Sequence, residues 1–186
     1  MPVEDRRDHT MPDPHLRPLR SGDASRVLEA FAEPDMSRQG HVENLADARC
    51  YIERLCDPDG VHRAFAMVGE DDELLGLVAV AIDGENRNGW FFYWTHPEGR
   101  GRGWTGRAAA TIAHHALTVL GLERLELGYR ANNPASGGVA RAAGFVQEGL
   151  ERGKFLVDGE RLDVVTCARL LTDPAPTTPL LRLNDR

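Results

Sequence analysis

The chain has 186 residues, of which 41% are hydrophobic and 27% charged, a composition typical of a globular domain and not of a disordered chain. No apolar run approaches the ~18 residues that cross a bilayer, so we expect no membrane association. A formal net charge of −7 argues against a nucleic-acid partner, and three cysteines without a CxxC pair favour a reducing, cytoplasmic setting.

The first half of the chain predicts an edge strand, two helices and an antiparallel meander. Residues 1–14 are expected to be a disordered arm, and residues 15–20 alternate as a short edge strand. Helical spacing follows Asp23, a plausible N-cap, and again follows Asn44. Three apolar runs separated by polar turns then predict strands over residues 64–68, 74–82 and 90–95.

The second half alternates helices and strands. Helical spacing resumes at Trp104 and ends near Gly121, and a strand follows over residues 124–129. A short helix opens in the run NNPAS, and two further strands lie on either side of the turn VDGE. Residues 172–186 contain DPAPTTP and are expected to be a loose tail.

This order of elements predicts an α+β domain over residues 15–171. Its central sheet is expected to be mixed but mostly antiparallel, with flanking helices and one βαβ-like crossover in the second half.

The segment richest in chemical features joins the third strand of the meander to the next helix. It reads Arg100, Gly101, Arg102, Gly103, Trp104, Thr105 and Gly106. Glycines let backbone amides approach a ligand and a helix N-terminus adds positive potential, so the loop suits a phosphate group. A tight turn without a ligand is the alternative. The P-loop lysine is absent, and the preceding meander is the wrong context for the dinucleotide fingerprint GxGxxG.

This loop resembles the acetyl-CoA pyrophosphate loop of the GNAT N-acetyltransferases, usually written [Q/R]-x-x-G-x-[G/A]. Arg100 matches the first position and Gly103 the glycine, whereas Thr105 stands where Gly or Ala is usual. Downstream, the run NPAS resembles the family's N-x-x-S, and AAGF its following GF. With the opening LRPLRSGDA, these features most resemble the ribosomal-protein-alanine acetyltransferase branch, and they imply the GNAT fold over residues 15–171.

The resemblance implies transfer of an acetyl group from acetyl-CoA to a primary amine, without a metal. Loop amides would hold the pyrophosphate, and the strand that ends at Thr95 would pair with the pantetheine arm. The cofactor-binding residues that it implies are Trp94, Thr95, His96, Arg100, Gly101, Arg102, Gly103, Trp104, Thr105, Gly106 and Asn133. Ser136 is the candidate that protonates the departing thiolate. A helix N-cap is the alternative role for Ser136, and an Asx turn that for Asn133.

The general base is left open. Members of this branch often carry a carboxylate near Lys154, but Phe155 stands at that place here, and Glu151 is the nearest upstream acid. A rival interpretation is therefore an acyl-CoA-binding protein that has lost catalysis.

The acceptor is also left open. The branch implies a protein or peptide N-terminal α-amine, and a small cationic amine of the aminoglycoside or polyamine type is the alternative. Acidic residues in two expected specificity loops either attract such a cation or lie in solvated turns; they are Glu33, Asp35, Asp83 and Glu85.

Trp90 to Trp94 are expected to form core on one face and cleft lining on the other. Either a monomer or a homodimer fits the sequence.

Overall fold

The structure is a computed structural model that describes residues 12–36 and 39–185, so most of the arm expected over residues 1–14 lies outside the described residues. One seven-stranded sheet has the order β1-β2-β3-β4-β5-β7-β6. The strands are β1 (His15–Pro18), β2 (His62–Val68), β3 (Leu74–Asp83), β4 (Asn88–Thr95), β5 (Arg124–Arg130), β6 (Val146–Val157) and β7 (Glu160–Leu170). The helices are α1 (Ala24–Phe31), α2 (Leu45–Cys56), α3 (Trp104–Thr118) and α4 (Pro134–Ala142), with 3-10 turns η1 (Ser21–Asp23), η2 (Pro34–Met36) and η3 (Pro97–Gly99).

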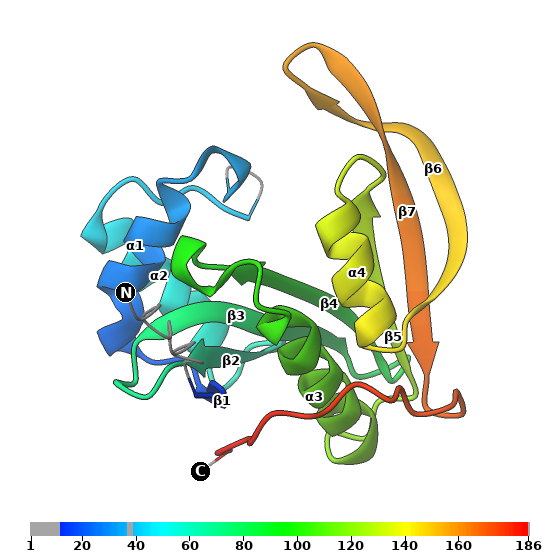
Figure 1. Cartoon of the computed structure of the whole chain (residues 1–186), viewed down its shortest axis with the longest axis horizontal. Helices are drawn as coiled ribbons and strands as arrows, with labels where there is room; N and C mark the ends of the chain where they lie inside the picture. Colours follow the sequence, from blue (N-terminus) through cyan, green and yellow to red (C-terminus); the bar gives the residue numbers. More distant parts are fainter. Residues whose placement is uncertain (1–11, 37–38, 186) are drawn as a thin grey trace, which may run out of the picture.

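The sheet is antiparallel except at one junction. β2, β3 and β4 pair as the predicted meander, and α3 then carries the chain across to β5, which runs parallel to β4. β5 pairs antiparallel with β7, and β7 with β6, in a long hairpin that projects beyond the rest of the sheet (Figure 1). The predicted α+β class, with a mostly antiparallel sheet and one βαβ crossover, is confirmed.

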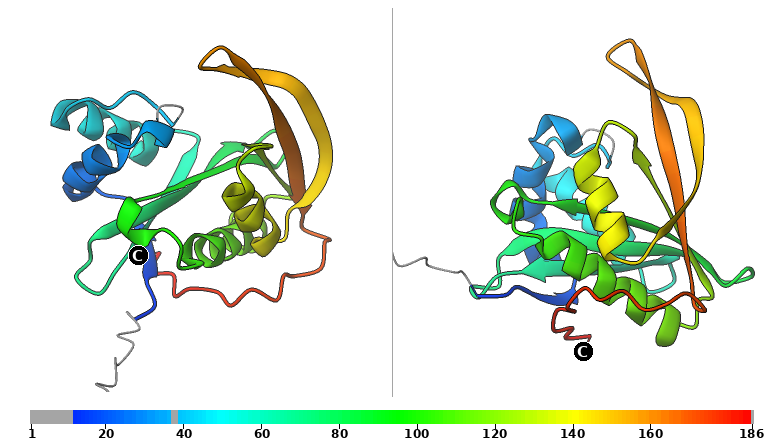
Figure 2. Two further views of the ribbon diagram at one scale, coloured as in Figure 1. Left: turned by 45° about the horizontal axis from the view of Figure 1, so that its top comes forward. Right: turned by 45° about the vertical axis from the view of Figure 1, so that its right-hand side comes forward.

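Helices cover both faces of the sheet, which explains why β3 is a continuous apolar run. Successive side chains of a strand point to opposite faces. Leu77 and Ala79 pack in a core with α1 and α2, whereas Val78 and Val80 pack in a second core with α3. Figure 2 shows the two helix pairs on opposite sides of the sheet.

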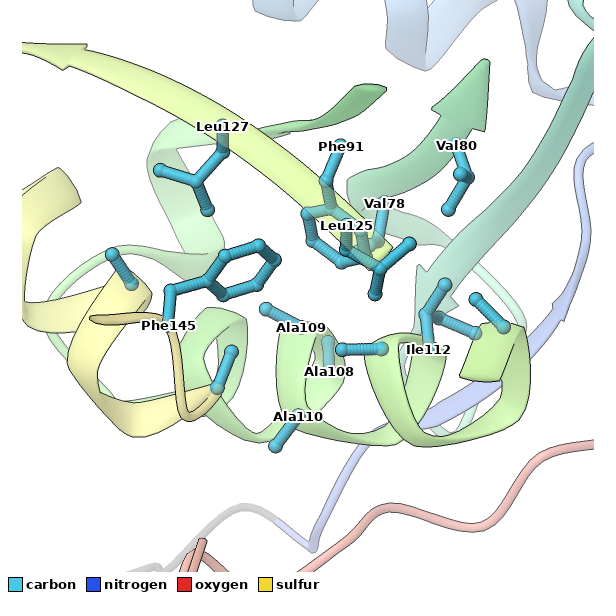
Figure 3. Packing of buried hydrophobic residues seen from close by; sticks show 14 of the residues in the cluster. Val78, Val80, Phe91, Ala108, Ala109, Ala110, Ile112, Leu125, Leu127 and Phe145 are labelled. Atoms are coloured by element: carbon cyan, nitrogen blue, oxygen red, sulfur yellow. The ribbon is translucent and has the colours of Figure 1, made fainter. Parts of the chain in front are cut away.

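α3 lies close to the sheet because small side chains line its buried surface. Ala108, Ala109 and Ile112 are fully buried. They pack in the same core cluster as Phe91 of β4 and Leu125 of β5 (Figure 3). The helix predicted to start at Trp104 is therefore confirmed, and this packing fixes its N-terminus beside the end of β4.

The two predicted N-caps had different outcomes. Asn44 caps α2 as predicted: its side-chain oxygen accepts bonds from the amides of Ala46 and Asp47 at 2.9 and 3.0 Å. Asp23 precedes α1 but has helical dihedral angles and makes no side-chain cap there, so that prediction was wrong. Instead, its buried carboxylate accepts two bonds from the buried Arg17 guanidinium, at 2.7 and 2.9 Å.

Arg17 also reaches a second carboxylate and so ties three segments together. Its Nε donates to Asp72 Oδ1 at 2.6 Å. Asp72 lies in the turn between β2 and β3, and it receives a further bond from Arg20. Both hydrogen bonds favour the charged carboxylate and lower the pKa of Asp72, the larger effect coming from Arg17.

The carboxyl-terminal segment differs from the loose tail that the sequence suggested. It has little regular secondary structure, yet it runs along α3 back to β1 (Figures 1 and 2). Leu181 is buried in the core, and its amide donates to Thr111 Oγ1 of α3 at 2.9 Å. Leu16 of β1 bridges Leu183 in parallel. Prolines favour an extended path, but the chain is held by contacts that its local composition does not reveal.

Within the described residues, no helix combines the length and the apolar character that a membrane crossing requires.

Candidate active site

β4 and β5 separate shortly after they meet, and this opening creates the site. Their parallel pairing covers only Asn88–Trp90 of β4 and Arg124–Glu126 of β5. Beyond it the strands continue on either side of a cleft of about 860 Å³. β4 still pairs with β3, and β5 with β7, so each strand keeps one backbone edge turned toward the opening. Such an edge can bond an extended, amide-containing ligand.

The glycine loop closes one end of this cleft. Gly101 and Gly103 both have left-handed backbone conformations, with φ of 75° and 72°, which residues with a side chain rarely adopt. A Cβ atom added at either position would meet nothing within 4 Å, so the backbone faces open space. Gly103 is also the residue at the N-cap of α3, where unpaired amides and the helix dipole attract an anion. The loop therefore fits a phosphate-bearing ligand.

Two threonines and a helix contact hold the loop in place. Thr95 Oγ1 at the end of β4 lies 2.7 Å from Thr105 Oγ1 in the first turn of α3. This contact explains how a threonine serves where the family motif usually has Gly or Ala. Gly106 lies where α3 meets α4, and a Cβ there would come within 3.0 Å of Ala142 Cβ. Thr95, Thr105, Gly106 and Ala142 all line the cleft.

Arg100 extends from the loop across the end of the cleft. Its Nε donates to the Thr95 carbonyl at 3.2 Å, and its terminal nitrogen donates to Asp35 Oδ1 of η2 at 3.1 Å. Glu33 lies 3.8 Å from the same guanidinium. Arg100 and Asp35 both line the cleft, whereas Asp83, which ends β3, and Glu85, in the turn that follows, are not among its lining residues.

The residues predicted from the N-x-x-S run lie on the opposite wall. Asn133 caps α4, since its side-chain oxygen accepts a bond from the Ser136 amide at 3.1 Å. The cap is therefore Asn133 and not Ser136, and the alternative role given to the serine was wrong. Among the described residues, no hydrogen bond occupies the Ser136 hydroxyl, and both residues line the cleft.

Tyr93 links the two walls. Its hydroxyl donates to the Ser136 carbonyl at 3.1 Å, across the opening between β4 and α4. Burial is the main cause that raises the pKa of Tyr93 to about 12, so the phenol stays protonated at neutral pH. In the sequence, only its position before Trp94 and Thr95 places Tyr93 on the strand expected to pair with pantetheine. Its hydroxyl contact with α4 depends on the tertiary fold.

Three residues of the predicted cofactor set are not among the cleft-lining residues. Trp104 is buried in the core, and Arg102 lies over its ring with 4.9 Å from the guanidinium carbon to the ring centroid. His96 is buried under the loop: its Nδ1 accepts a bond from the Glu98 amide at 3.3 Å and lies 3.2 Å from an Arg26 nitrogen. Burial, followed by the nearby Arg26 charge, lowers the pKa of His96.

Trp94 lines the cleft through β4, but its indole belongs to the opposite core. Its Nε1 donates to the hydroxyl of Tyr51 in α2 at 3.1 Å. Phe91 is buried in the core against α3, whereas Trp90 is half exposed. The aromatic strand thus divides between core and cleft lining, as the sequence suggested.

Several cleft residues were not singled out in the sequence. Tyr129 and Arg130 end β5, and Gln39 donates to the Tyr93 carbonyl at 3.4 Å. The signal for the first two was their place at the end of a strand just before the NPAS run. Phe155 also lines the cleft, while Glu151 pairs with Lys154 at 2.7 Å and is not part of the lining.

No cluster of three or more His, Cys, Asp or Glu side chains able to hold a metal ion occurs in the part of the chain that the structure describes. The groups available for chemistry at this site are therefore backbone amides, hydroxyls and a few charged side chains.

A mixed sheet opened between two parallel strands, with an anion loop at the end of the opening, defines a class of acyl-CoA-dependent transferases. The chain matches the acetyltransferase (GNAT) domain over residues 15–146 and belongs to this family, which uses acetyl-CoA. The predicted class is thus confirmed at the level of the family.

Two sequence relatives have names that refer to ribosomal acetylation. The ribosomal-protein-serine acetyltransferase of Escherichia coli K12 is 32% identical over 107 residues, which cover 56% of this chain and 59% of that protein. The match thus spans less than two thirds of the length of that relative. The putative ribosomal N-acetyltransferase YdaF of Bacillus subtilis 168 is 26% identical over 163 residues, covering 81% of this chain and 87% of that protein.

A solved structure supports the fold. The spermidine N-acetyltransferase of Vibrio cholerae, crystallised with CoA and spermine, superposes with a TM-score of 0.77 over 87% of this chain and 97% of that chain. At 24% identity, this likeness bears on the fold alone.

Proposed function

We propose that the protein transfers the acetyl group of acetyl-CoA to the N-terminal α-amine of a protein or peptide. The neutral amine nitrogen attacks the thioester carbonyl carbon and forms a tetrahedral intermediate. The carbon–sulfur bond then breaks, the departing thiolate takes a proton, and the new amide loses the extra proton of the amine. The names of the two sequence relatives support an acceptor of this kind.

The observation that carries the choice of acceptor is the lack of a strong base. Among the described residues that line the cleft there is no histidine, and the one carboxylate, Asp35, is bonded to Arg100. An α-amine has a pKa of about 7.7–8.0, so a large fraction is neutral near pH 8, whereas a lysine-type amine has a pKa of about 10.4. A cleft without a strong base suits the amine that gives up its proton most easily.

The charge of the cleft supports the same choice. Its described lining carries two arginines, Arg100 and Arg130, against one carboxylate. A polyamine brings several positive charges and would be repelled unless more carboxylates faced it. An α-amine brings one positive charge, and the neighbouring peptide carbonyls can accept hydrogen bonds from an arginine.

The proposed roles of the site residues follow from their positions. The amides around Gly101 and Gly103 hold the diphosphate of acetyl-CoA, and the free edge of β4 near Thr95 pairs with the pantetheine arm. The Ser136 hydroxyl donates to the departing thiolate, with Tyr93 fixing the start of α4 by its bond to the Ser136 carbonyl. The buried Trp104 and His96 support the loop from the protein interior, and the exposed Arg102 packs over the Trp104 ring.

The deciding experiment measures CoA release with three acceptors at matched concentration. They are a peptide with a free N-terminus, the same peptide with a blocked N-terminus and an internal lysine, and spermidine. We expect turnover with the first, with a rate that rises with pH through the pKa of its α-amine and then levels. Preferred turnover of spermidine would contradict the proposed acceptor. Tight acetyl-CoA binding with turnover of none of a broad amine panel would favour a non-catalytic acyl-CoA-binding protein.

A further inference from the structure

The contact between Arg100 and η2 joins the anion loop to the segment between α1 and α2 at one end of the cleft. Arg100 belongs to the anion loop, and Asp35 belongs to the segment between α1 and α2. Their side chains meet at 3.1 Å, Glu33 reinforces the contact at 3.8 Å, and all three side chains are between 37% and 55% exposed. A partly exposed ion pair of this kind is weak and exchanges partners readily.

An anion bound at the loop would compete for the same guanidinium. Arg100 immediately precedes Gly101, and the backbone of Gly101 and of Gly103 borders open space in the cleft lining. A diphosphate there carries more charge than one carboxylate and can take two parallel bonds from a guanidinium. Arg100 cannot satisfy the diphosphate and both carboxylates in full.

Asp35 is distinctive because of what else lines the cleft. It is the one carboxylate of the described lining, and the remaining charged groups there are Arg100 and Arg130. Once Arg100 turns to the diphosphate, the Asp35 carboxylate loses its partner inside the cleft. An ammonium group is the natural replacement.

We infer that Arg100 masks Asp35 until acetyl-CoA binds, and that the released Asp35 is the counter-charge that collects the ammonium form of the acceptor. The inference rests on the proposed function and adds to it a residue that binds the acceptor and a reason for the order of binding. Asp35 affects the capture of the acceptor. The captured α-amine then loses its proton without a strong base, because its pKa of about 7.7–8.0 lies close to neutral pH.

The inference predicts opposite effects of one substitution on the two substrates. In Asp35→Asn, Arg100 is held less firmly, so the Kd for acetyl-CoA, measured by calorimetry, should fall about threefold, the scale of one partly exposed ion pair. The KM for the free-N-terminus peptide should rise about fivefold or more. A merely structural role for Asp35 would not improve cofactor binding.

A double-mutant cycle separates release of Arg100 from a general charge effect. Asp35→Asn should tighten acetyl-CoA binding in the wild-type background but not in Arg100→Gln, where no guanidinium is left to release. Glu53→Gln removes the same charge from the exposed surface of α2, outside the cleft lining, and should leave the Kd unchanged.

The outcomes are distinct from those that test the proposed function. The inference would be overturned if Asp35→Asn lowered the Kd for acetyl-CoA equally in both backgrounds, or did not lower it at all. In either case, acetyl-CoA binding by the wild type would still support the loop as the cofactor site. Failure of the wild type to bind acetyl-CoA would overturn both. Tightening confined to the background with Arg100, together with a raised KM for the peptide, would support it.

Discussion

Single residues decide how the anion loop is built. Gly103 and Gly121 stand at the two ends of α3 in nearly the same backbone state, with φ of 72° and 75°, and a Cβ at either would meet nothing within 4 Å. Only Gly103 faces the cleft. The pair therefore separates the effect of backbone strain from the effect of blocking a ligand.

We expect Gly103→Ala to weaken acetyl-CoA binding at least tenfold, because the new methyl group lies where the diphosphate must approach the amides. Gly121→Ala should leave the affinity unchanged. Both should lose about 1 kcal/mol of unfolding free energy, the usual cost of alanine at positive φ. Calorimetry measures the acetyl-CoA affinity, and chemical denaturation measures the unfolding free energy. Equal acetyl-CoA affinities for the two variants would show that the loop does not bind the diphosphate.

Ser136→Ala should lower kcat about tenfold to a hundredfold, since the hydroxyl is proposed to act only as the thiolate leaves. The Kd for acetyl-CoA should stay the same. Asn133→Ala is the matched control in the same turn of α4: it removes the helix cap and should cost about 1 kcal/mol of stability. Steady-state kinetics measures kcat. A kcat of Ser136→Ala equal to that of the wild type would exclude the serine as the acid that protonates the thiolate.

Residue identity predicted some roles better than others. The loop glycines, Asn44 and the NPAS run could be found in the sequence because their signals are local. Asp23 was misassigned because its partner, Arg17, lies on another element. The contact of Arg100 with Asp35 likewise joins residues far apart in the chain, and no periodicity reports such a pair.

At the scale of elements, the strands and helices follow closely from hydrophobic spacing, but the opening of the sheet does not. Alternating and continuous apolar runs predict the meander, and the return of helical spacing at Trp104 predicts the crossover. How far β4 and β5 pair is set by tertiary packing, since both strands carry apolar residues well beyond Trp90 and Glu126. The cleft was therefore expected from family resemblance and not from periodicity.

The Arg17 contacts show how one buried side chain joins elements. Arg17→Met should cost about 3 kcal/mol, because it leaves the carboxylate of Asp23 buried without its partner. Arg20→Met is the control: Arg20 is largely exposed and shares only Asp72, so it should cost less than 1 kcal/mol. Urea denaturation at pH 7 gives both values, and equal costs would show that the burial of the pair is irrelevant to its strength.

At the scale of the whole molecule, the carboxyl-terminal segment is part of the domain packing. Leu181→Ala should cost about 2 kcal/mol, at the low end for a buried leucine because the segment lies at the edge of the core. Its neighbour Leu180 is 46% exposed, and Leu180→Ala should change stability by less than 0.5 kcal/mol. Thermal unfolding of both variants tests this, and equal melting temperatures would mean that the segment is not anchored by Leu181.

The bridge between Leu16 and Leu183 has a consequence for how the protein is made. β1 lies at an edge of the sheet, where unpaired backbone groups invite strands of other molecules. Its partner on that side comes from nearly the other end of the sequence, so a growing polypeptide on the ribosome carries this edge bare until almost the entire domain has emerged. During synthesis, this edge is therefore open to pairing with other chains until the carboxyl-terminal segment arrives.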